Sequence, residues 1–401
     1  MTALFVACAL FVAYTYAGFP ALLWLRLRLR ETRGEPAGSK VGARLGAGPG
    51  KPFDAASDSL PFVSVVIAAH DEAATLPDKI ASLDALDWPR ERLEAVIVSD
   101  GSTDATAAIL DAAARTRPWL RPLRCARPEG KPTALNRGVE AARGEVLVFM
   151  DARQRIGPEA VRELVAALGR PDVGAASGEL HLDAGDAPDG ASVGLYWAYE
   201  KWIRTMESDL HSTTGATGAL YAIRRADYEP HRADVLLDDF DTPVALLRRG
   251  LRTVFVPGAR VFDLAEAQAS GEFRRKVRTL AGNFQSFARA PWLFDPRRNP
   301  VWWQFLSHKV ARLIVPYALL GAFASALLGS GPFLDTMLAL QVALYGLGLA
   351  SVAGLETRPG NVVRVFVQLN AAAVLGAWRW ASGGTGSLWR RPAAPTGRRG
   401  A

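Results

Sequence analysis

Carboxylates stand where three strongly apolar runs of the sequence end. PFVSVVIAAH is followed by Asp71 and Glu72, LEAVIVSD ends in Asp100, and GEVLVFMD ends in Asp151. Apolar runs of this kind, rich in β-branched residues, are typical of strands buried on both faces in a parallel sheet. Ligands of such sheets gather beyond the carboxyl ends of the strands. We therefore expect these acids to share one cleft, although each could instead be an N-cap or an Asx turn leading into the next helix.

Helical segments separate the apolar runs. In DEAATLPDKIASLDAL, residues Leu76, Ile80, Leu83 and Leu86 recur at helical spacing, and another helix is expected after GSTDAT. Strands that alternate with helices imply right-handed crossovers and a parallel sheet. The middle of the chain is therefore predicted to be an α/β domain, with a mostly parallel sheet flanked by helices.

Long apolar segments lie toward both ends of the chain. Residues 2–25 carry no charge and are followed at once by RLRLRETR, which predicts a transmembrane helix with a cytoplasmic exit. A cleaved signal peptide is the alternative, but its basic cluster would precede the apolar run. From about residue 311 the chain is long and apolar enough for two more passes. A last segment, NVVRVFVQLNAAAVLGAW, contains Arg364 and is expected to lie at the interface or to re-enter, because a full pass would leave the basic tail outside.

The net charge of +7 is modest, and much of it flanks apolar segments, where arginine anchors helices to anionic membrane lipid. Nucleic acid is therefore not an expected partner, and the two cysteines form neither a disulfide framework nor a metal site. The expected organisation is a transmembrane helix with a basic flank at 1–30, a flexible linker at 31–60, a cytoplasmic catalytic domain at 61–270, basic and aromatic interfacial helices at 271–309, two or three transmembrane segments at 310–380, and a basic tail at 381–401.

Six segments resemble, in order, the motifs of the inverting family 2 glycosyltransferases, whose nucleotide-sugar-binding domain has the GT-A fold. VSVVIAAHDEAATL resembles the first strand and its Asn-Glu loop, with Asp71 where Asn is usual, and EAVIVSDGSTDAT is similar to the second strand and nucleotide loop. EGKPTALNRG resembles the Gly-Lys-x-x-Ala-Leu-Asn segment, VLVFMDA the strand with the metal motif, GATGALYAIRR the acceptor-side loop, and LLDDFD the Glu-Asp motif. The resemblance covers about residues 61–285 and implies sugar transfer, with inversion, from a nucleotide sugar, most commonly a UDP-sugar.

The resemblance implies a role for each acidic strand end. Glu72 and Asp100 would contact the nucleoside, and Lys131 would lie near the nucleotide. A divalent cation, Mg²⁺ or Mn²⁺, would bridge Asp151 and the diphosphate of the donor, because such ions prefer oxygen ligands.

The same resemblance makes Asp239 the general base that deprotonates the acceptor hydroxyl, with Asp238 in the place of the usual glutamate. The alternative interpretation is that Asp238, Asp239 and Asp241 cap the helix TPVALLRRG, since acids are favourable near a helix start.

The metal motif of the family is usually Asp-x-Asp, but here it is Asp151-Ala152-Arg153. Asp151 could hold the cation alone, with diphosphate and water completing its shell. Arg153 could instead supply positive charge itself, by pairing with phosphate oxygens. In a third interpretation Arg153 pairs with Asp151 and occupies the place of the ion, which leaves an inactive nucleotide-sugar binder. We expect Asp151 to bind the metal while Arg153 faces the diphosphate.

Polysaccharide synthases of this family carry Gln-x-x-Arg-Trp after the base motif. The corresponding FRRKVRTLAGNFQ, aligned on Arg278, has Arg275 for Gln and Thr279 for Trp. Arg278 would still approach the diphosphate, but RRKVR is alternatively a basic interfacial helix on anionic lipid. We therefore predict a multi-pass cell-membrane glycosyltransferase that adds one or few sugars to a lipid-linked or membrane-proximal saccharide acceptor in cell-envelope or exopolysaccharide synthesis. The alternatives are a processive polysaccharide synthase and a nucleotide-sugar-binding subunit without activity.

Overall fold

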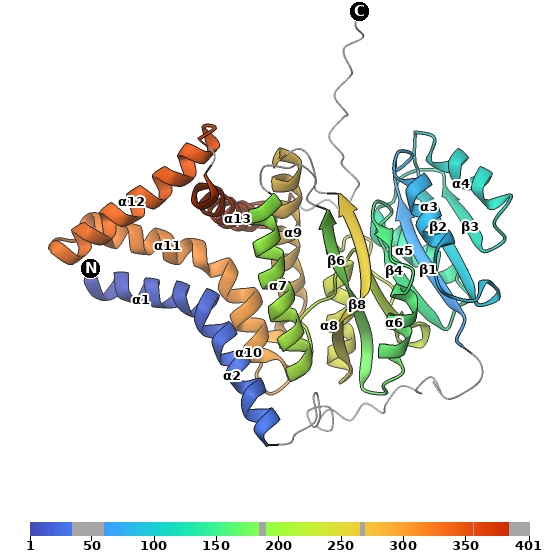
Figure 1. The fold of residues 1–401 in the computed structure, drawn as a ribbon, viewed down its shortest axis with the longest axis horizontal. Helices are drawn as coiled ribbons and strands as arrows, with labels where there is room; N and C mark the ends of the chain where they lie inside the picture. The colour runs from blue at the N-terminus through green and yellow to red at the C-terminus, as the bar shows by residue number, and fades with distance from the viewer. Residues whose placement is uncertain (34–59, 184–189, 265–268, 356, 385–401) are drawn as a thin grey trace, which may run out of the picture.

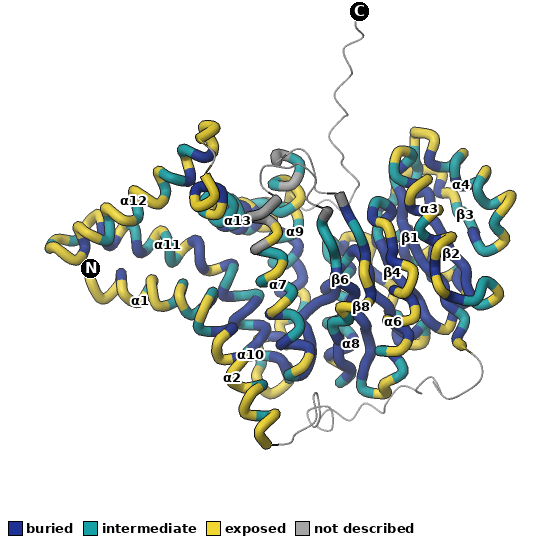
Figure 2. Tube along the Cα trace, in the orientation of Figure 1, coloured by how far each residue is buried: buried dark blue, intermediate teal, exposed yellow. Residues whose placement is uncertain are grey.

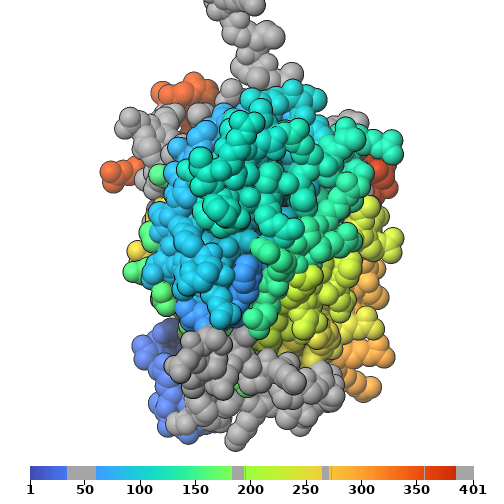
Figure 3. Space-filling view, turned by 90° about the vertical axis from the view of Figure 1, so that its right-hand side faces the viewer, coloured from blue at the N-terminus to red at the C-terminus, as the bar shows by residue number. Residues whose placement is uncertain are grey.

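The structure, a computed structural model, describes residues 1–33, 60–183, 190–264, 269–355 and 357–384. The predicted linker and basic tail lie almost wholly outside these ranges. An α/β domain occupies one side of the molecule, and long helices from both ends of the chain gather on the other (Figure 1). The first half of the α/β domain forms the end of the molecule that faces away from α1 and α12 (Figure 3).

One eight-stranded sheet forms the centre of the α/β domain, with the strand order β3-β2-β1-β4-β7-β6-β8-β5. The strands β3, β2, β1 and β4 are parallel, as the apolar runs predict, whereas β7 is antiparallel to both of its neighbours, β4 and β6. The sheet is therefore mixed, and its parallel half carries the first acidic strand ends. The strands are β1 (Val63–Ala69), β2 (Leu93–Asp100), β3 (Leu120–Cys125), β4 (Val146–Met150), β5 (Arg155–Ile156), β6 (Val173–Asp183), β7 (Leu220–Arg224) and β8 (Arg252–Leu264).

Helices cover both faces of the sheet because successive strand residues point to opposite faces. Val65 and Ile67 of β1 pack in one core with α3, α4 and α6, while Val66 and Ala68 pack in a second core with α5 and α8. Every residue of β1 and β2 is buried, as expected for strands covered on both sides (Figure 2). These helices are α3 (Leu76–Asp84), α4 (Thr106–Ala114), α5 (Lys131–Ala141), α6 (Ala160–Leu168) and α8 (Asp238–Arg248).

Two long helices lie between the sheet and the apolar helices, namely α7 (Gly190–Leu210) and α9 (Ala269–Arg289) (Figure 1). The helix α9 occupies the region predicted to be interfacial, and it packs along α13. Beyond these two lie α1 (Thr2–Ala13), the π-helical turn η1 (Tyr14–Gly18), α2 (Phe19–Thr32), α10 (Trp302–Gln304), the π-helical turn η6 (Phe305–Val310), α11 (Ala311–Leu328), α12 (Pro332–Val352) and α13 (Arg358–Ala381), with short 3₁₀ turns at Arg90–Arg92, Arg225–Asp227 and Pro291–Phe294.

Four helices in the described residues are long and apolar enough to cross a membrane: Thr2–Thr32, Trp302–Leu328, Pro332–Val352 and Arg358–Ala381. Large apolar side chains on them face outward, including Leu328 and Leu349, which are 76% and 69% exposed. Apolar surface of this extent is typical of a membrane or protein contact. The last apolar segment, expected at the interface, thus forms one continuous helix with the length and composition of a full span.

Gly138 of α5 allows this helix to lie close to the sheet. A Cβ atom at Gly138 would lie 2.6 Å from Val66 Cγ1 and 3.3 Å from Val98 Cγ2, both buried β-branched side chains. Such side chains are stiff and sit in a close-packed core, so they have little freedom to move away. Because α5 begins with Lys131, this close approach also fixes the position of the lysine relative to the sheet.

We predict that Gly138→Ala lowers the free energy of unfolding by about 1 kcal/mol, since overpacking costs roughly 1–3 kcal/mol and the gain in helix propensity offsets about 1 kcal/mol. Denaturant unfolding of the detergent-solubilised protein measures this change. Gly194→Ala is the matched control, because an added Cβ at Gly194 in α7 meets nothing within 4 Å. It should stabilise the protein slightly, and equal effects of the two substitutions would contradict the packing argument.

Candidate active site

The carboxyl ends of β1, β2 and β4 lie at one edge of the sheet because the three strands are parallel neighbours. The Asp100 carboxylate at the end of β2 is fully buried and accepts hydrogen bonds from the backbone N–H groups of Glu129, at 3.0 Å, and Gly130, at 2.7 Å. It therefore orders the loop that leads into α5 and Lys131. A direct contact between Asp100 and a nucleoside stays a prediction.

Asp71 occupies the left-handed backbone region with φ of 53°, where Asn and Asp are among the few residues tolerated. This explains how aspartate can stand where the family usually has asparagine. Its Oδ1 accepts a hydrogen bond from Thr103 N at 2.8 Å, which joins the loops after β1 and β2. Glu72 beside it is buried, and its Oε2 accepts a hydrogen bond from Thr75 Oγ1 at 2.8 Å. Both predicted loops thus meet at one place.

Lys131 joins the two halves of the site. Its Nζ lies 2.9 Å from Asp151 Oδ1, after β4, and 3.1 Å from Asp238 Oδ1, at the start of α8. Burial lowers the pKa of Lys131, but Asp151 and Asp238 together raise it well above its usual range. The ammonium group is therefore a permanent positive charge between two acids that are distant in sequence.

Arg153 pairs with an acid that the sequence did not indicate. Its Nη2 lies 2.6 Å from Asp263 Oδ2 near the end of β8, and the same oxygen accepts a hydrogen bond from Gln154 Nε2 at 3.0 Å. Asp151, in contrast, has Lys131 as its ion partner. Asp263 is thus one ion partner of Arg153, and the roles of Arg153 toward Asp151 and the diphosphate stay predictions.

A buried lysine, Lys79, lies beside the end of β4, which Asp151 follows in the sequence. Lys79 of α3 is 0% exposed, and its Nζ lies 3.5 Å from Met150 Sδ at the end of β4. Burial lowers the pKa of Lys79 to about 7, although the negative charges of Asp151, Asp263 and Glu72 oppose the shift. A signal was present in the sequence, because position 79 falls on the apolar face of the helix defined by Leu76 and Ile80.

The two acids of the LLDDFD segment form the first turn of α8. With Asp241 they place three acids in this turn, where carboxylates are favourable, although the N-cap residue is Leu237 and no side-chain capping hydrogen bond is made. Asp238 is buried; burial raises its pKa, but Lys131 and His231 together with hydrogen bonds to the carboxylate lower it below its usual value. Burial and the neighbouring Asp238 carboxylate raise the pKa of Asp239 to about 6. The two adjacent carboxyl groups therefore differ in pKa. Such a difference lets neighbouring carboxyl groups take different roles in proton transfer.

The GATGALYAIRR segment forms the wall against Asp239. A Cβ atom at Gly218 would lie 2.7 Å from Asp239 Oδ2, so only glycine leaves the carboxylate its present position. Ala216 N donates a hydrogen bond to the backbone oxygen of Asp239 at 2.8 Å. The predicted acceptor-side loop and the predicted base are thus in direct contact.

The protein offers a divalent cation few ligands of its own. In the ranges that the structure describes, no group of three or more His, Cys, Asp or Glu residues could hold a metal ion. The Asp151 side chain is 38% exposed, and Lys131 contacts only its Oδ1. Mg²⁺ is commonly held by one or two carboxylates together with water and substrate phosphates, so this donor set fits a cation that binds with the nucleotide.

Arg278 is carried by α9, the helix that packs along α13. It is exposed on α9, and within the described part of the chain no hydrogen bond or ion pair joins it to the other predicted site residues. Its expected approach to the diphosphate therefore stays a prediction.

Comparisons with known proteins agree with this fold. Residues 64–231 match the family model described as Glycosyl transferase family 2. A mannosyltransferase from Pyrobaculum calidifontis, solved with GDP-Man and Mn²⁺, superposes with a TM-score of 0.69 at 22% identity, over 94% of this chain and 99% of that one. The fold is thus confirmed as GT-A, and residues 64–231 form a domain of glycosyl transferase family 2.

Curated relatives match over shorter stretches. The β-monoglucosyldiacylglycerol synthase of Synechocystis sp. is 33% identical over 124 residues, which are 30% of this chain and 26% of that protein. The undecaprenyl-phosphate 4-deoxy-4-formamido-L-arabinose transferase of Shewanella sediminis is 33% identical over 112 residues, 27% of this chain and 34% of that protein. The matched segment thus spans about a quarter to a third of the length of these relatives.

We predict that Lys131→Met lowers the free energy of unfolding by about 3 kcal/mol near neutral pH, because it leaves the Asp238 carboxylate buried without its cation. The double variant Lys131→Met, Asp238→Asn should recover most of this loss. Denaturant unfolding of the four members of the double-mutant cycle measures the coupling.

Arg117→Met is the control for losing an exposed ion pair, since Arg117 Nε lies 2.7 Å from Asp84 Oδ2 and both side chains are about a third exposed, and it should cost about 1 kcal/mol or less. If the double variant were as unstable as Lys131→Met alone, the buried charge on Asp238 would not be the cause.

Proposed function

We propose that the protein transfers a sugar, with inversion, from a nucleotide sugar to a lipid-linked or saccharide acceptor at a membrane, in cell-envelope or exopolysaccharide synthesis. The observation that carries this proposal is that Asp239, whose pKa is about 6, adjoins the Asp151–Lys131–Asp238 cluster, which links the family 2 domain of residues 64–231 to the start of α8. One side of this site can bind a leaving diphosphate, and the other can accept a proton.

The donor side neutralises the charge that develops on the leaving group. When the bond between the sugar C1 and the diphosphate breaks, its electron pair stays on the diphosphate oxygen, and positive charge fixed nearby stabilises this change. Lys131 provides one such charge. Asp151 would hold a divalent cation, which would supply Lewis-acid charge to the diphosphate, and the Mn²⁺ of the Pyrobaculum protein supports a cation of this kind.

The acceptor side removes a proton. At pH 7 a carboxyl group with a pKa of about 6 is mostly ionised, yet it is a stronger base than an ordinary aspartate. Asp239 takes the proton of the acceptor hydroxyl as the hydroxyl oxygen bonds to C1 from the face opposite the diphosphate. Glu72 and Asp100 would complete the donor side, as the family resemblance implies, and Arg153, where the chain departs from the family motif, would face the diphosphate.

Membrane partners follow from the apolar helices and from the relatives. The four helices support a multi-pass protein with its catalytic domain in the cytoplasm, where nucleotide sugars are made. The names of two relatives include a diacylglycerol glycolipid and undecaprenyl phosphate, which supports a lipid-borne acceptor. UDP-sugars are the family's usual donors, while the Pyrobaculum enzyme was solved with GDP-Man, so both nucleotides belong in a donor screen.

The assay is the release of nucleoside diphosphate by the detergent-solubilised protein, across a panel of nucleotide sugars, with and without a membrane lipid extract. Stimulation by the extract and a product of discrete mass support single transfer. A ladder of products would instead indicate a processive synthase, and donor binding without release would indicate an inactive binding subunit.

Asp239→Asn should lower transfer by at least about a hundredfold, because general-base catalysis contributes roughly 10²–10⁴-fold, while donor binding is retained. In the unsubstituted protein kcat/KM should fall about tenfold per pH unit below pH 6, where Asp239 becomes protonated, and level off above it. Steady-state rates and equilibrium binding of the donor measure both effects.

The matched control is Asp241→Asn, two residues further along α8. Asp241 Oδ1 accepts a hydrogen bond from Ser286 Oγ at 2.7 Å. It should keep most of the transfer rate. Substantial turnover by Asp239→Asn, or a pH profile without an acidic limb, would show that another group is the base.

Asp151→Asn should weaken Mn²⁺ binding in the presence of nucleoside diphosphate by at least about tenfold, since the carboxylate is the main protein ligand proposed for the ion. Electron paramagnetic resonance of free Mn²⁺ measures this binding without turnover, and EDTA should abolish transfer by the unsubstituted protein. Asp78→Asn, at an exposed position of α3, is the control. Full transfer in EDTA would instead assign the cation's role to Lys131 and Arg153.

A further inference from the structure

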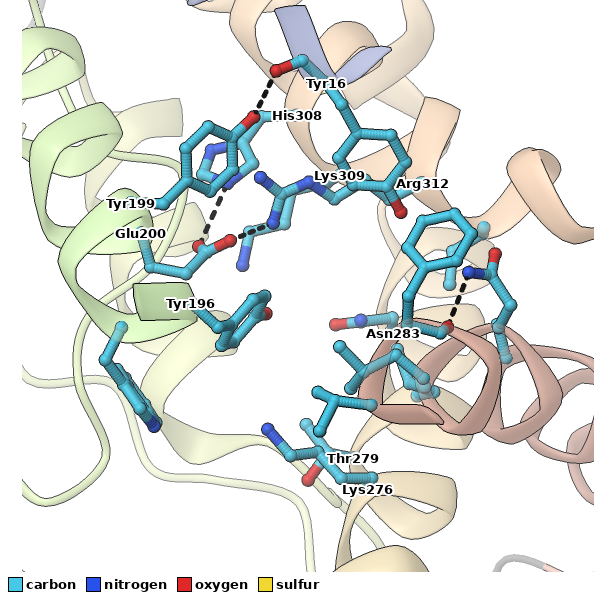
Figure 4. Close-up of a pocket in the computed structure, with 18 of the residues that line it drawn as sticks. Tyr16, Tyr196, Tyr199, Glu200, Lys276, Thr279, Asn283, His308, Lys309 and Arg312 are labelled. Atoms are coloured by element: carbon cyan, nitrogen blue, oxygen red, sulfur yellow. Dashed lines mark hydrogen bonds and ion pairs between the residues drawn. The ribbon is translucent and has the colours of Figure 1, made fainter. Parts of the chain in front are cut away.

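A cavity of about 500 Å³ lies where the α/β domain meets the apolar helices. Side chains from η1, α7, α9, η6, α11 and α13 surround it, and Figure 4 shows them arranged around an open centre. The predicted catalytic residues do not line this cavity, so it is a second feature beside the donor site.

Cationic groups dominate the polar part of the cavity wall. Arg204, Lys276, Lys309 and Arg312 line it, against Glu200 as its one carboxylate among the described lining residues. Glu200 is already occupied, because it pairs with Arg312 and its Oε2 lies 3.3 Å from His308 Nε2. The cavity therefore has an excess of positive charge.

Two of these cations keep unused hydrogen-bonding capacity. Arg312 Nε and Nη2 are buried and have no hydrogen-bond partner within the described part of the chain. Among the same residues, Lys309 Nζ makes no hydrogen bond or ion pair, and its nearest recorded partner is the Phe240 ring, 5.8 Å from the ring centroid. The buried Arg312 donors without partners cost free energy, and Lys309 adds a positive charge beside them, so an anionic ligand that accepts hydrogen bonds from these groups would be favoured.

The opposite part of the wall is apolar and belongs to a candidate membrane span. Val362, Val365, Phe366 and Leu369 of α13 line it. Lys309 and Arg312 themselves lie on the helix Trp302–Leu328, which is long and apolar enough to cross a membrane. Charged residues within such helices are costly and are characteristic of ligand sites. The combination of cations with an apolar wall fits a molecule with a phosphate head and a hydrocarbon chain.

The cavity adjoins the predicted base. A Cβ atom at Gly215 would lie 3.9 Å from Lys309 Nζ and 3.8 Å from the backbone oxygen of Asp239, so Lys309 and the Asp239 backbone both lie beside this glycine. Arg204 Nη1 donates a hydrogen bond to Thr217 Oγ1 in the same loop at 2.7 Å. A ligand held by Lys309 and Arg204 would thus approach Asp239 from the membrane side.

We propose that this cavity binds the phosphate group of a lipid acceptor, with the hydrocarbon chain against α13 and a hydroxyl of the same molecule directed at Asp239. This inference rests on the proposed function and narrows its acceptor to anionic lipids. In the reaction the lipid hydroxyl oxygen bonds to C1 of the sugar, its proton passes to Asp239, and the bond from C1 to the diphosphate breaks. The lipid phosphate changes no bonds and serves only to hold the acceptor.

Equilibrium binding to the full detergent-solubilised chain tests the proposal with three probes. Lysophosphatidic acid and monoacylglycerol share one acyl chain and differ in the phosphate, while glycerol 3-phosphate has the phosphate without the chain. We expect lysophosphatidic acid to bind at least about tenfold more tightly than either of the others, since hydrogen bonds to charged groups and chain burial each contribute that much. Equal binding of lysophosphatidic acid and monoacylglycerol overturns the proposal, and equal binding of lysophosphatidic acid and glycerol 3-phosphate overturns the placement of the chain.

Lys309→Met should weaken lysophosphatidic acid binding about tenfold without affecting monoacylglycerol, and Lys309→Arg should restore most of the affinity. Leu369→Trp, which fills the apolar wall, should weaken both lipids. Arg274→Met is the control, because Arg274 is an exposed cation of α9 that does not line the cavity. Unchanged binding in both Lys309→Met and Leu369→Trp would exclude the cavity.

These experiments distinguish a failure of the cavity assignment from a failure of the proposed transferase function. If the three probes bind as expected but no nucleotide sugar releases its diphosphate, the cavity assignment stands and the transferase function is wrong. If transfer occurs and Lys309→Met changes neither lysophosphatidic acid binding nor the KM for the lipid acceptor, the transferase function stands and the cavity assignment is wrong.

Discussion

The ion pairs of Lys131 with Asp151 and Asp238 are the interaction on which the site depends. Asp151 follows a strand of the parallel half of the sheet, while Asp238 begins a helix that packs beyond the antiparallel strand β7. One ammonium group between two carboxylates holds these elements at contact distance, and each pair is partly screened from water. Because Asp239 is adjacent to Asp238, the same lysine also influences how strongly the predicted base holds its proton.

Much of the fold follows from patterns within the sequence. The β-branched runs at β1, β2 and β4 predict buried parallel strands, and the structure confirms them. The mixed half of the sheet was harder to predict, because β6 and β8 are parallel neighbours that lie far apart in sequence, with β5 at the edge. Short apolar segments do not specify their direction or partner by themselves, since pairing is a tertiary property.

The meeting of Asp151 with the LLDDFD segment was predictable, because a motif fixes both their residue types and their positions along the chain. The site was less predictable where the partner comes from another element. Asp263 is 110 residues from Arg153 in sequence, and nothing local indicates that these two residues form an ion pair. The close contact of Gly218 with Asp239 likewise depends on how a loop packs against a helix. Such contacts arise from chain topology, which a single sequence leaves open.

The polar network at the membrane side explains how the apolar helices could be coupled to the catalytic domain. His308 lies between two buried acids of α7, with Nδ1 2.8 Å from Glu207 Oε1 and Nε2 3.3 Å from Glu200 Oε2. Buried polar networks specify one arrangement of the elements they join, because any shift leaves donors and acceptors unpaired. The helix that carries His308, Lys309 and Arg312 is therefore fixed relative to α7, and α7 carries Arg204, which holds the loop beside Asp239. The network thus gives the cavity beside the apolar helices a defined position relative to the predicted base, as the proposed transfer to a lipid held in that cavity requires.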